Sequence, residues 1–374
     1  MGLPESPETH GTPLSEEAES PALPARDPAP DSPASPGRLG NVGGLKKPGA
    51  RRKFMEYGGA ALLVALALGF AVAQQLYAFA SAISPQSPLT SQLNFSGSTR
   101  INVLVLGDDG GDASDADITD SMLMISLQPQ TGKTALISVP RDFGIHLPIS
   151  TEVYFKIDAA YDYGRVFGDG RVSPGRVAGG NLAAREVSQV TGLSVPYWIT
   201  LDFQGFLQVV DALGGVDIDV PCAFTALDTV HFSAGWQHMD GARALEYARE
   251  RQVVDNPAED SDFARSARQR QLVEAIVARM NQVSSWPNFL RVLHSLQNSI
   301  YTNLSARDLS VFVRKVDRAH TKSIGLTTQN VLENVTAPGG LQILAPKNGD
   351  AGLISQYIQQ QLQSNSADQA LPAC

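Results

Sequence analysis

The residues of this chain that are best suited to chemistry are an aspartate-rich loop and a set of arginines. The loop, GDDGGDASDADITDSM, contains Asp108, Asp109, Asp112, Asp115, Asp117 and Asp120. It follows an apolar run, 101–106, that is typical of a buried strand, and ligands of α/β proteins bind at the carboxyl ends of such strands. Mg²⁺ or Mn²⁺ takes oxygen ligands, and Mg²⁺ needs only one or two protein carboxylates. Asp109 and Asp120 flank the loop and are the candidate metal ligands; for the other aspartates a plain acidic loop is the simpler interpretation.

Arginines gather in three places after this loop. The segments are SVPRD with Arg141, ALEYARERQ with Arg249 and Arg251, and SDFARSARQRQ with Arg265, Arg268 and Gln269. The last three follow the spacing i, i+3, i+4, so they share one face of a helix. Basic residues near a helix N-terminus oppose the helix dipole unless an anion is bound there. Together these side chains predict one anion site, and a pyrophosphate with its metal is the ligand we expect. A surface ion pair of Arg141 with Asp142 is the alternative at the first segment.

The backbone of ALEYARERQ decides whether its two arginines can act together. We predict that the helix after Asp240 ends near Ala248 and that 249–251 is extended. Alternate side chains of an extended segment point the same way, so Arg249 and Arg251 would then reach one ligand. In a helix the two would diverge by about 200°. A solvated helix end, where cations suit the helix dipole, is the alternative.

Composition narrows the class of protein. The formal net charge is −9, which argues against nucleic acid as a partner. Neither a Gly-x-Ser-x-Gly motif nor a P-loop occurs, and phosphoryl transfer needs neither because positioning and charge supply most of the catalysis. The chain has two cysteines, Cys222 and Cys374. A single bridge and two unpaired thiols both fit the sequence.

The elements that must position these residues are strands first and helices later. After 101–106, the segments SMLMISLQP and KTALISVP read as strands joined by the turn PQTGK, and KSIGLT as a last strand. Helical patterns occur in GNLAAREVSQVTG, DFQGFLQVVDALGG, DGARALEYA, RSARQRQLVEAIVARM, SSWPNFLRVLHSLQNSI and SARDLSVFVRKVDRA. Asp262 and Ser305 are the expected helix caps, the second with Asp308 three residues on. The class is α/β, a three-layer α-β-α domain with a central mixed sheet.

The N-terminal part has a different organisation. Residues 1–53 are rich in Pro, Gly, Ser, Glu and Ala and end in a basic cluster, which predicts a disordered cytoplasmic tail. Residues 54–83 then contain a long uncharged run, which predicts a single transmembrane signal anchor with the following domain outside the cell membrane. A cleaved signal peptide is the alternative, because AFASA resembles a cleavage site. The remaining segments are a linker at 84–99, the folded domain at 100–362 and a C-terminal tail at 363–374.

Six separated blocks of the sequence resemble the LytR-CpsA-Psr family. They are INVLVLGDD, TDSMLMISLQPQTGKTALISVPRD, KIDAAY, DFQGFLQVVDALGGVDIDVP, HMDGARALEYARER and SDFARSARQRQ, in the family's order. The resemblance implies an extracytoplasmic enzyme that transfers a glycopolymer from a polyprenyl-pyrophosphate carrier to peptidoglycan or a similar envelope acceptor. It also implies a lipid-binding pocket between sheet and helices, lined in part by GFLQVVDAL.

Roles carry over to matching residues only. By resemblance, Asp109 and Asp120 bind Mg²⁺, while Arg141, Arg249, Arg251, Arg265 and Gln269 hold the pyrophosphate. Asp109, Arg249 and Arg251 are the catalytic candidates, and Arg268 joins the anion site by its spacing alone.

The chain departs from the family pattern at three positions. Ile118 stands where an arginine is usual, GGD follows the first metal aspartate instead of a further arginine, and Asp158 replaces the asparagine of KIN. Two other functions therefore stay open. One is an envelope regulator that binds a polyprenyl phosphate without turnover, which Ile118 favours. The other is a polyprenyl-pyrophosphate hydrolase, with water as the acceptor.

Overall fold

The computed structural model describes residues 50–84, 93–97, 99–108, 119–227, 230–257, 259–280, 299–316 and 320–364. The chain divides into two compact units, 1–60 and 61–374. Of the first unit only the beginning of helix α1 (Ala50–Ile83) is described. Within α1 the segment Leu66–Ile83, with mean hydropathy 1.5, is long and apolar enough to cross a membrane. The predicted tail 1–53 and linker 84–99 lie mostly outside the described residues.

A six-stranded mixed sheet forms the centre of the second unit. Its strands are β1 (Ile101–Asp108), β2 (Ser121–Leu127), β3 (Thr134–Ser138), β6 (Tyr197–Asp202), β11 (Ile300–Thr302) and β12 (Thr321–Gly325). They lie in the order β11-β6-β1-β2-β3-β12. β1 is antiparallel to β2 and parallel to β6, so the predicted mixed sheet is confirmed. β6 and β11 were not anticipated from the sequence.

The strand sequences are apolar because the sheet is covered on both faces. A hydrophobic core lies on each face of the sheet. Leu104 and Leu106 of β1 belong to one core, and the preceding residue, Val103, belongs to the other. All three side chains are 0% exposed. Successive side chains of a strand point to opposite faces, so an uninterrupted apolar run is what a doubly covered strand requires.

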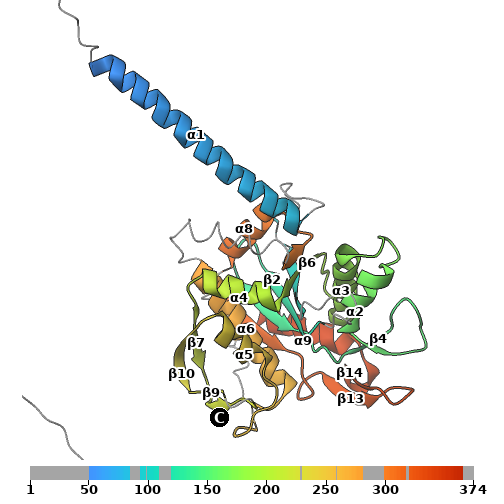
Figure 1. The fold of residues 1–374 in the computed structure, drawn as a ribbon. Coiled ribbons are helices and arrows are strands. Elements are labelled where there is room, and N and C mark those ends of the chain that lie inside the picture. Colours follow the sequence, from blue (N-terminus) through green and yellow to red (C-terminus); the bar gives the residue numbers. More distant parts are fainter. Residues whose placement is uncertain are drawn as a thin grey trace, which may run out of the picture. The chain divides into compact units, whose positions relative to one another are not determined.

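Helices form the two outer layers (Figure 1). On one face lie α2 (Ala159–Phe167), α3 (Arg176–Thr191) and α9 (Gly352–Gln363), and on the other lie α6 (Asp262–Met280) and α8 (Ala306–Lys315). The predicted three-layer α-β-α architecture is therefore confirmed. α3 approaches β6 closely: a Cβ at Gly180 would lie 2.2 Å from the ring of Trp198, which is 1% exposed.

A third apolar cluster lies beside the sheet. It joins α4 (Phe203–Ala212), α5 (Gly241–Arg249) and α6 to the hairpin of β7 (Val216–Val220) and β10 (Gly235–Met239). The short elements that complete the described fold are β4 (Gly144–Ile145), β5 (Phe155–Lys156), β8 (Phe224–Thr225), β9 (His231–Phe232), β13 (Leu332–Thr336), β14 (Gln342–Pro346) and η3 (Lys347–Gly349). Cys222 is buried and disulfide-bonded, whereas Cys374 lies outside the described residues.

The predicted helix ends agree with the structure in one case and fail in another. The hydroxyl of Ser305 accepts a hydrogen bond from the Asp308 amide at 3.0 Å, as its capping pattern predicts. The expected cap of α6, Asp262, is wrong: Ser261 precedes the helix, and its hydroxyl accepts from the Ala264 amide at 3.0 Å. Asp262 is already helical, which leaves its carboxylate available to neighbouring cations. Most of the predicted helix SSWPNFLRVLHSLQNSI lies outside the described residues.

Candidate active site

A cavity of about 200 Å³ lies between the sheet and helices α4, α5 and α6. Its polar lining comprises Asp120, Ser121, Asp202, Arg249, Arg251, Arg265 and Gln269. Its apolar lining comprises Val105, Leu106, Leu201, Phe203, Phe206, Leu245, Ala248, Leu272, Val273 and Ile276, with Gly107 between the two sets. One cavity thus combines cationic and carboxylate groups with a hydrophobic wall.

Strand direction brings the polar residues of this site together. β2 is antiparallel to β1, so its first residue, Ser121, lies opposite Gly107 near the end of β1. β3 is antiparallel to β2, so Arg141, which follows β3, returns to the same edge. The first turns of α6 supply Arg265 and Gln269 from the helix layer.

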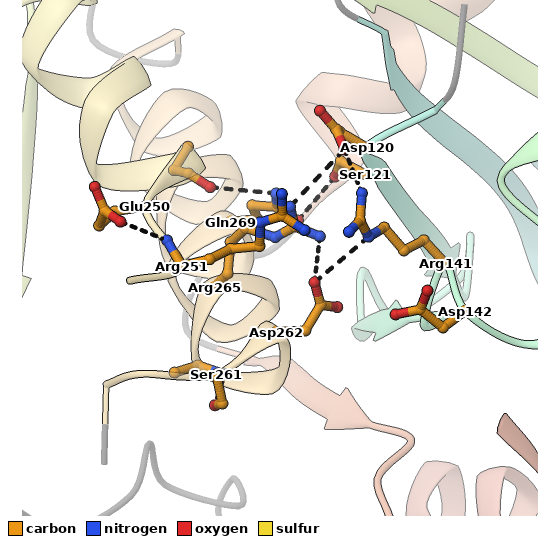
Figure 2. A network of polar contacts seen from close by, with 12 residues as sticks. Asp120, Ser121, Arg141, Asp142, Glu250, Arg251, Ser261, Asp262, Arg265 and Gln269 are labelled. Carbon is orange, nitrogen blue, oxygen red and sulfur yellow. Dashed lines mark hydrogen bonds and ion pairs between the residues drawn. The ribbon is translucent and has the colours of Figure 1, made fainter. Parts of the chain in front are cut away.

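Two carboxylates and two guanidiniums alternate at this edge (Figure 2). Asp120 accepts a hydrogen bond from Arg141 Nη1 at 2.7 Å and lies 3.9 Å from Arg265 Nη1. Asp262 lies 2.5 Å from Arg265 Nη2 and 3.6 Å from Arg141 Nε. The Nε atoms of both arginines are buried and lack a hydrogen-bond acceptor within the described residues. The cluster therefore leaves two buried donors unsatisfied.

The pKa of Arg265 lies below the usual arginine value. Its side chain is 4% exposed. Burial lowers its pKa, the nearby cations of Arg141 and Arg251 lower it further, and the carboxylates of Asp262 and Asp120 act in the opposite direction. A nearby negative charge would act in the same direction as these carboxylates and raise the pKa of Arg265.

Gln269 connects the sheet edge to the end of α5. Ser121 Oγ donates to Gln269 Oε1 at 2.9 Å, and Gln269 Nε2 donates to the Ala248 carbonyl at 3.3 Å. Sequence reasoning selected Gln269 but missed Ser121, because a serine that begins an apolar strand resembles an ordinary strand boundary. The antiparallel register that places it opposite Gly107 could not be read from the local sequence.

α5 ends one residue later than predicted. Arg249 is its last helical residue, and Glu250 is extended with φ −60° and ψ 132°. The prediction that 249–251 is wholly extended is therefore wrong at Arg249, where the intrahelical hydrogen bonds continue to Glu250 N–H. Arg249 and Arg251 nevertheless line the same cavity, because the chain leaves the helix between them.

These two arginines differ from Arg141 and Arg265 in their surroundings. Both are exposed, and neither guanidinium forms an ion pair with a carboxylate in the described part of the chain. The guanidinium of Arg249 lies 4.3 Å from the ring centroid of Phe203, which also lines the cavity. Stacking on an aromatic ring orients a guanidinium and leaves its edge free to donate hydrogen bonds.

Arg268 points away from the cavity, contrary to the prediction from its spacing. Its guanidinium is 1% exposed, lies 2.5 Å from the carboxylate of Glu259, and donates to the carbonyls of Tyr247 at 3.0 Å and of Glu250. It does not line the cavity. Arg268 therefore fixes the backbone on either side of Arg249 and has no direct access to a ligand there.

The metal prediction can be examined only in part. Asp109 lies outside the described residues, as do Asp112, Asp115, Asp117 and Ile118. Among the described residues no group of three or more His, Cys, Asp or Glu side chains gathers as a metal site. Asp120 is 36% exposed and lines the cavity, as does Asp202, so carboxylate oxygens of the kind that Mg²⁺ binds are present there. The donor chemistry fits Mg²⁺, which uses few protein ligands when phosphate oxygens complete its shell.

Asp158, which departs from the asparagine usual in the family, lies next to this network. Its side chain is 8% exposed. Burial raises its pKa to about 6; Arg141 and Lys156 oppose this rise, whereas Asp142 adds to it. Its backbone carbonyl accepts a hydrogen bond from the Thr119 hydroxyl at 3.0 Å, just before Asp120. An ionisable group has thus been placed in a position where its charged form is disfavoured.

Known proteins resemble this chain in sequence and in fold. The family model described as LytR_cpsA_psr family matches residues 68–352. The polyisoprenyl-teichoic acid–peptidoglycan teichoic acid transferase TagU of Oceanobacillus iheyensis is 31% identical over 213 residues, which cover 57% of this chain and 62% of that relative. The TagU of Bacillus mycoides is 30% identical over 206 residues, 55% of this chain and 60% of the relative. The chain thus spans about three fifths of the length of the curated relatives it matches.

Solved structures share the fold at low sequence identity. The crystal structure of B. subtilis TagV has a TM-score of 0.54 and 22% identity, covering 72% of this chain and 100% of that one. The structure described as TagT bound to LIIa-WTA has a TM-score of 0.54 and 22% identity, covering 74% and 95%. At this identity the similarity establishes the architecture.

Replacing Arg268 is expected to destabilise the protein strongly. Arg268→Ala would leave the 2%-exposed side chain of Glu259 without its cation and two carbonyls without their donor. We expect a loss of about 3–5 kcal/mol in the free energy of unfolding, measured by urea titration of the detergent-solubilised protein. Arg251→Ala, which removes an exposed arginine, is the control and should change it by less than about 0.5 kcal/mol. Equal effects of the two substitutions would contradict the structural role of Arg268.

Replacing Asp158 is expected to stabilise the protein at neutral pH. Because the folded-state pKa, about 6, lies above the ordinary aspartate value of 3.8, the folded state binds the proton more tightly, and stability is lost as pH rises from about 4 to 6. Asp158→Asn should therefore raise the free energy of unfolding at pH 7.5 by roughly 1–3 kcal/mol, since a pKa difference of one corresponds to about 1.4 kcal/mol. The gain should shrink towards pH 4. A gain that does not depend on pH would mean that the charge of Asp158 is not its cause.

Proposed function

Because the chain belongs to the LytR-CpsA-Psr family, we propose that it transfers a glycopolymer from a polyprenyl-pyrophosphate carrier to peptidoglycan or another envelope acceptor. The names of its relatives, which are polyisoprenyl-teichoic acid–peptidoglycan teichoic acid transferases, support this class of reaction.

The observation that carries the proposal is the two-sided lining of a single cavity. A polyprenyl pyrophosphate has a charged head and an apolar chain. The cavity lining supplies both kinds of contact, since Arg249, Arg251 and Arg265 are cationic and the apolar lining includes Phe206, Leu272 and Ile276. Burial of apolar surface favours the lipid, at roughly 25 cal/mol per Å². Forked hydrogen bonds from guanidiniums favour the phosphates. α4 lines this wall through Phe203 and Phe206, consistent with the lipid pocket that the family resemblance implies.

In the proposed reaction a hydroxyl oxygen of the acceptor bonds to the phosphorus that carries the glycan. The bridging P–O bond breaks, its electron pair leaves with the polyprenyl phosphate, and the hydroxyl proton is released. Arg249 and Arg251 hold the phosphate oxygens on which charge accumulates, which is the main way that proteins promote phosphoryl transfer. Three further contacts hold the geometry of the site. They join Arg141 to Asp120, Arg265 to Asp262, and Gln269 to Ser121.

Mg²⁺, or Mn²⁺, is the cofactor we propose, held by Asp120 and Asp109. When bound, such an ion neutralises phosphate charge and favours departure of the leaving group. Asp120 would then exchange part of its contact with Arg141 for the cation. The guanidinium of Arg141 would be free to donate to a phosphate oxygen instead.

The membrane is the remaining partner in the proposal. Basic residues precede the apolar helix segment Leu66–Ile83, and such residues stay on the cytoplasmic side. We therefore propose a single-pass anchor with its N-terminus in the cytoplasm and the catalytic domain outside. That placement brings the domain to the same membrane surface as a lipid-linked donor.

Arginine-to-lysine substitutions test the roles of Arg249 and Arg251. Lysine keeps the charge but loses the fork. With a lipid-pyrophosphate donor and a peptidoglycan acceptor, Arg249→Lys and Arg251→Lys should each lower kcat/KM by about 5- to 150-fold, or about 1–3 kcal/mol, without loss of stability. Arg307→Lys, on the exposed side of α8, is the control. Wild-type turnover in both site variants would remove these residues from the site, and release of free glycan phosphate without acceptor would favour the hydrolase.

Asparagine substitutions test the metal proposal. Two carboxylates near one site bind a cation more tightly than one does, so Asp109→Asn and Asp120→Asn should each weaken Mg²⁺ binding, read by calorimetric titration of the lipid-free protein. Asp115→Asn lies in the same acidic loop and should have almost no effect. Equal weakening by all three substitutions would mean that the loop attracts cations only through its overall charge.

A further inference from the structure

A second space adjoins the cavity on the far side of Arg249 and Arg251. This groove, of about 830 Å³, is lined by Leu207, Ala242, Leu245, Glu246, Arg249, Glu250, Arg251 and Gln252. It shares Leu245, Arg249 and Arg251 with the cavity. The two arginines thus separate an inner space with apolar walls from an outer groove. Its lining holds two cations and two carboxylates. Once a pyrophosphate occupies Arg249 and Arg251, the charges left are those of Glu246 and Glu250, and for this reason we call the outer space the acidic groove.

The backbone places the two carboxylates at the same end of α5. Glu250 N–H donates to the carbonyl of Glu246 at 3.2 Å, so the residues lie one turn apart. Glu250 Oε1 accepts from the amides of Arg251 at 2.8 Å and Gln252 at 2.7 Å, which fixes its carboxylate. Figure 2 shows Glu250 on the opposite side of Arg251 from Asp120 and Arg141. Glu250 therefore lies away from the cluster of Asp120 and Arg141 (Figure 2).

We propose that the acidic groove binds an uncharged saccharide segment next to the pyrophosphate, and that Glu246 and Glu250 exclude glycans that carry phosphate. The proposal rests on the proposed function. Carboxylates and the amide of Gln252 accept and donate the hydrogen bonds that sugar hydroxyls need. A teichoic acid is a phosphodiester polymer, so each repeat in the groove would bring a negative charge beside these carboxylates, and like charges in a partly desolvated groove repel.

Two saccharides meet at the reacting phosphorus, namely the glycan of the donor and the sugar of the acceptor. Either can occupy the acidic groove, since both lie beyond the arginines when the lipid occupies the cavity. The chemistry required is the same: hydroxyl groups without fixed negative charge. Separate variation of the charge on donor and acceptor identifies the occupant.

The test uses the full chain in lipid nanodiscs with two lipid-pyrophosphate donors that differ only in a phosphate on the third sugar. Affinity is measured by calorimetry, and transfer is measured separately with an uncharged oligosaccharide acceptor. We expect wild type to prefer the uncharged donor by about 5- to 50-fold. Glu246→Gln should reduce this ratio several-fold and Glu246→Lys should remove or invert it. Glu152→Gln, which removes one charge from the loop between β4 and β5, is the matched control and should leave the ratio unchanged.

Ionic strength provides a readout that a merely structural role would not change. The preference should weaken as KCl rises, because screening shortens the Debye length to about 10 Å at 0.1 M and about 3 Å at 1 M.

In the acceptor arm the uncharged oligosaccharide is replaced by one that bears a carboxylate. A ratio that responds to acceptor charge but not to donor charge assigns the acidic groove to the acceptor, and the reverse result assigns it to the donor glycan.

Three outcomes separate this inference from the proposed function. Equal affinity and equal transfer for both donors and both acceptors would overturn the inference while leaving transferase activity intact. Charge-selective binding without transfer would uphold the acidic groove and contradict the transferase. A preference that Glu246→Gln and Glu152→Gln change equally would also overturn the inference, because the net charge of the protein, and not the groove, would then set it.

Discussion

The mutual repulsion of several guanidiniums is the constraint around which this domain is organised. Arg141 and Arg265 lie within reach of the same two carboxylates, Asp120 and Asp262, and the repulsion between them is relieved only because these carboxylates alternate with them. Strand direction makes this possible, since the ends of β1, β2 and β3 that carry or adjoin the site lie along one edge. The compensation is incomplete, because the buried Nε atoms of both arginines lack acceptors within the described residues. The site is thus an internally paired network of two carboxylates and two guanidiniums.

Rigidity at the site comes from a different arginine. Arg268 is fully enclosed, pairs with Glu259 and holds the carbonyls of Tyr247 and Glu250. A buried ion pair of this kind contributes little net stability compared with an apolar pair, but loss of one partner is costly. Its value lies in position: by holding the backbone on both sides of the end of α5, it sets where Arg249 and Arg251 project. On α6, Arg268 thus supports the backbone, whereas Arg265 lines the cavity.

The two exposed arginines also form a boundary between two environments. Inside them the lining is mostly apolar, where a hydrocarbon chain gains from leaving water. Outside them Glu246, Glu250 and Gln252 offer a polar surface of negative charge. A molecule with a lipid, a pyrophosphate and a glycan meets these environments in the order of its own parts.

The sequence by itself determined the apolar strands, the α/β class, the helix after Asp240 and the group of residues from which the site is drawn, because these depend on local periodicity and on motifs. The direction of each side chain was decided by tertiary packing. Arg265, Arg268 and Gln269 share a broad helix face, yet Arg268 and Gln269 are separated by about 100° around the axis. The packing of α6 against both α5 and the sheet turns Arg268 towards Tyr247 and Gln269 towards Ser121. Likewise, the sequence pattern predicted Asp262 as the cap of α6, whereas Ser261 is the cap in the structure. A shift of one residue at a helix start changes the sequence pattern little, but it frees the Asp262 carboxylate to pair with Arg265.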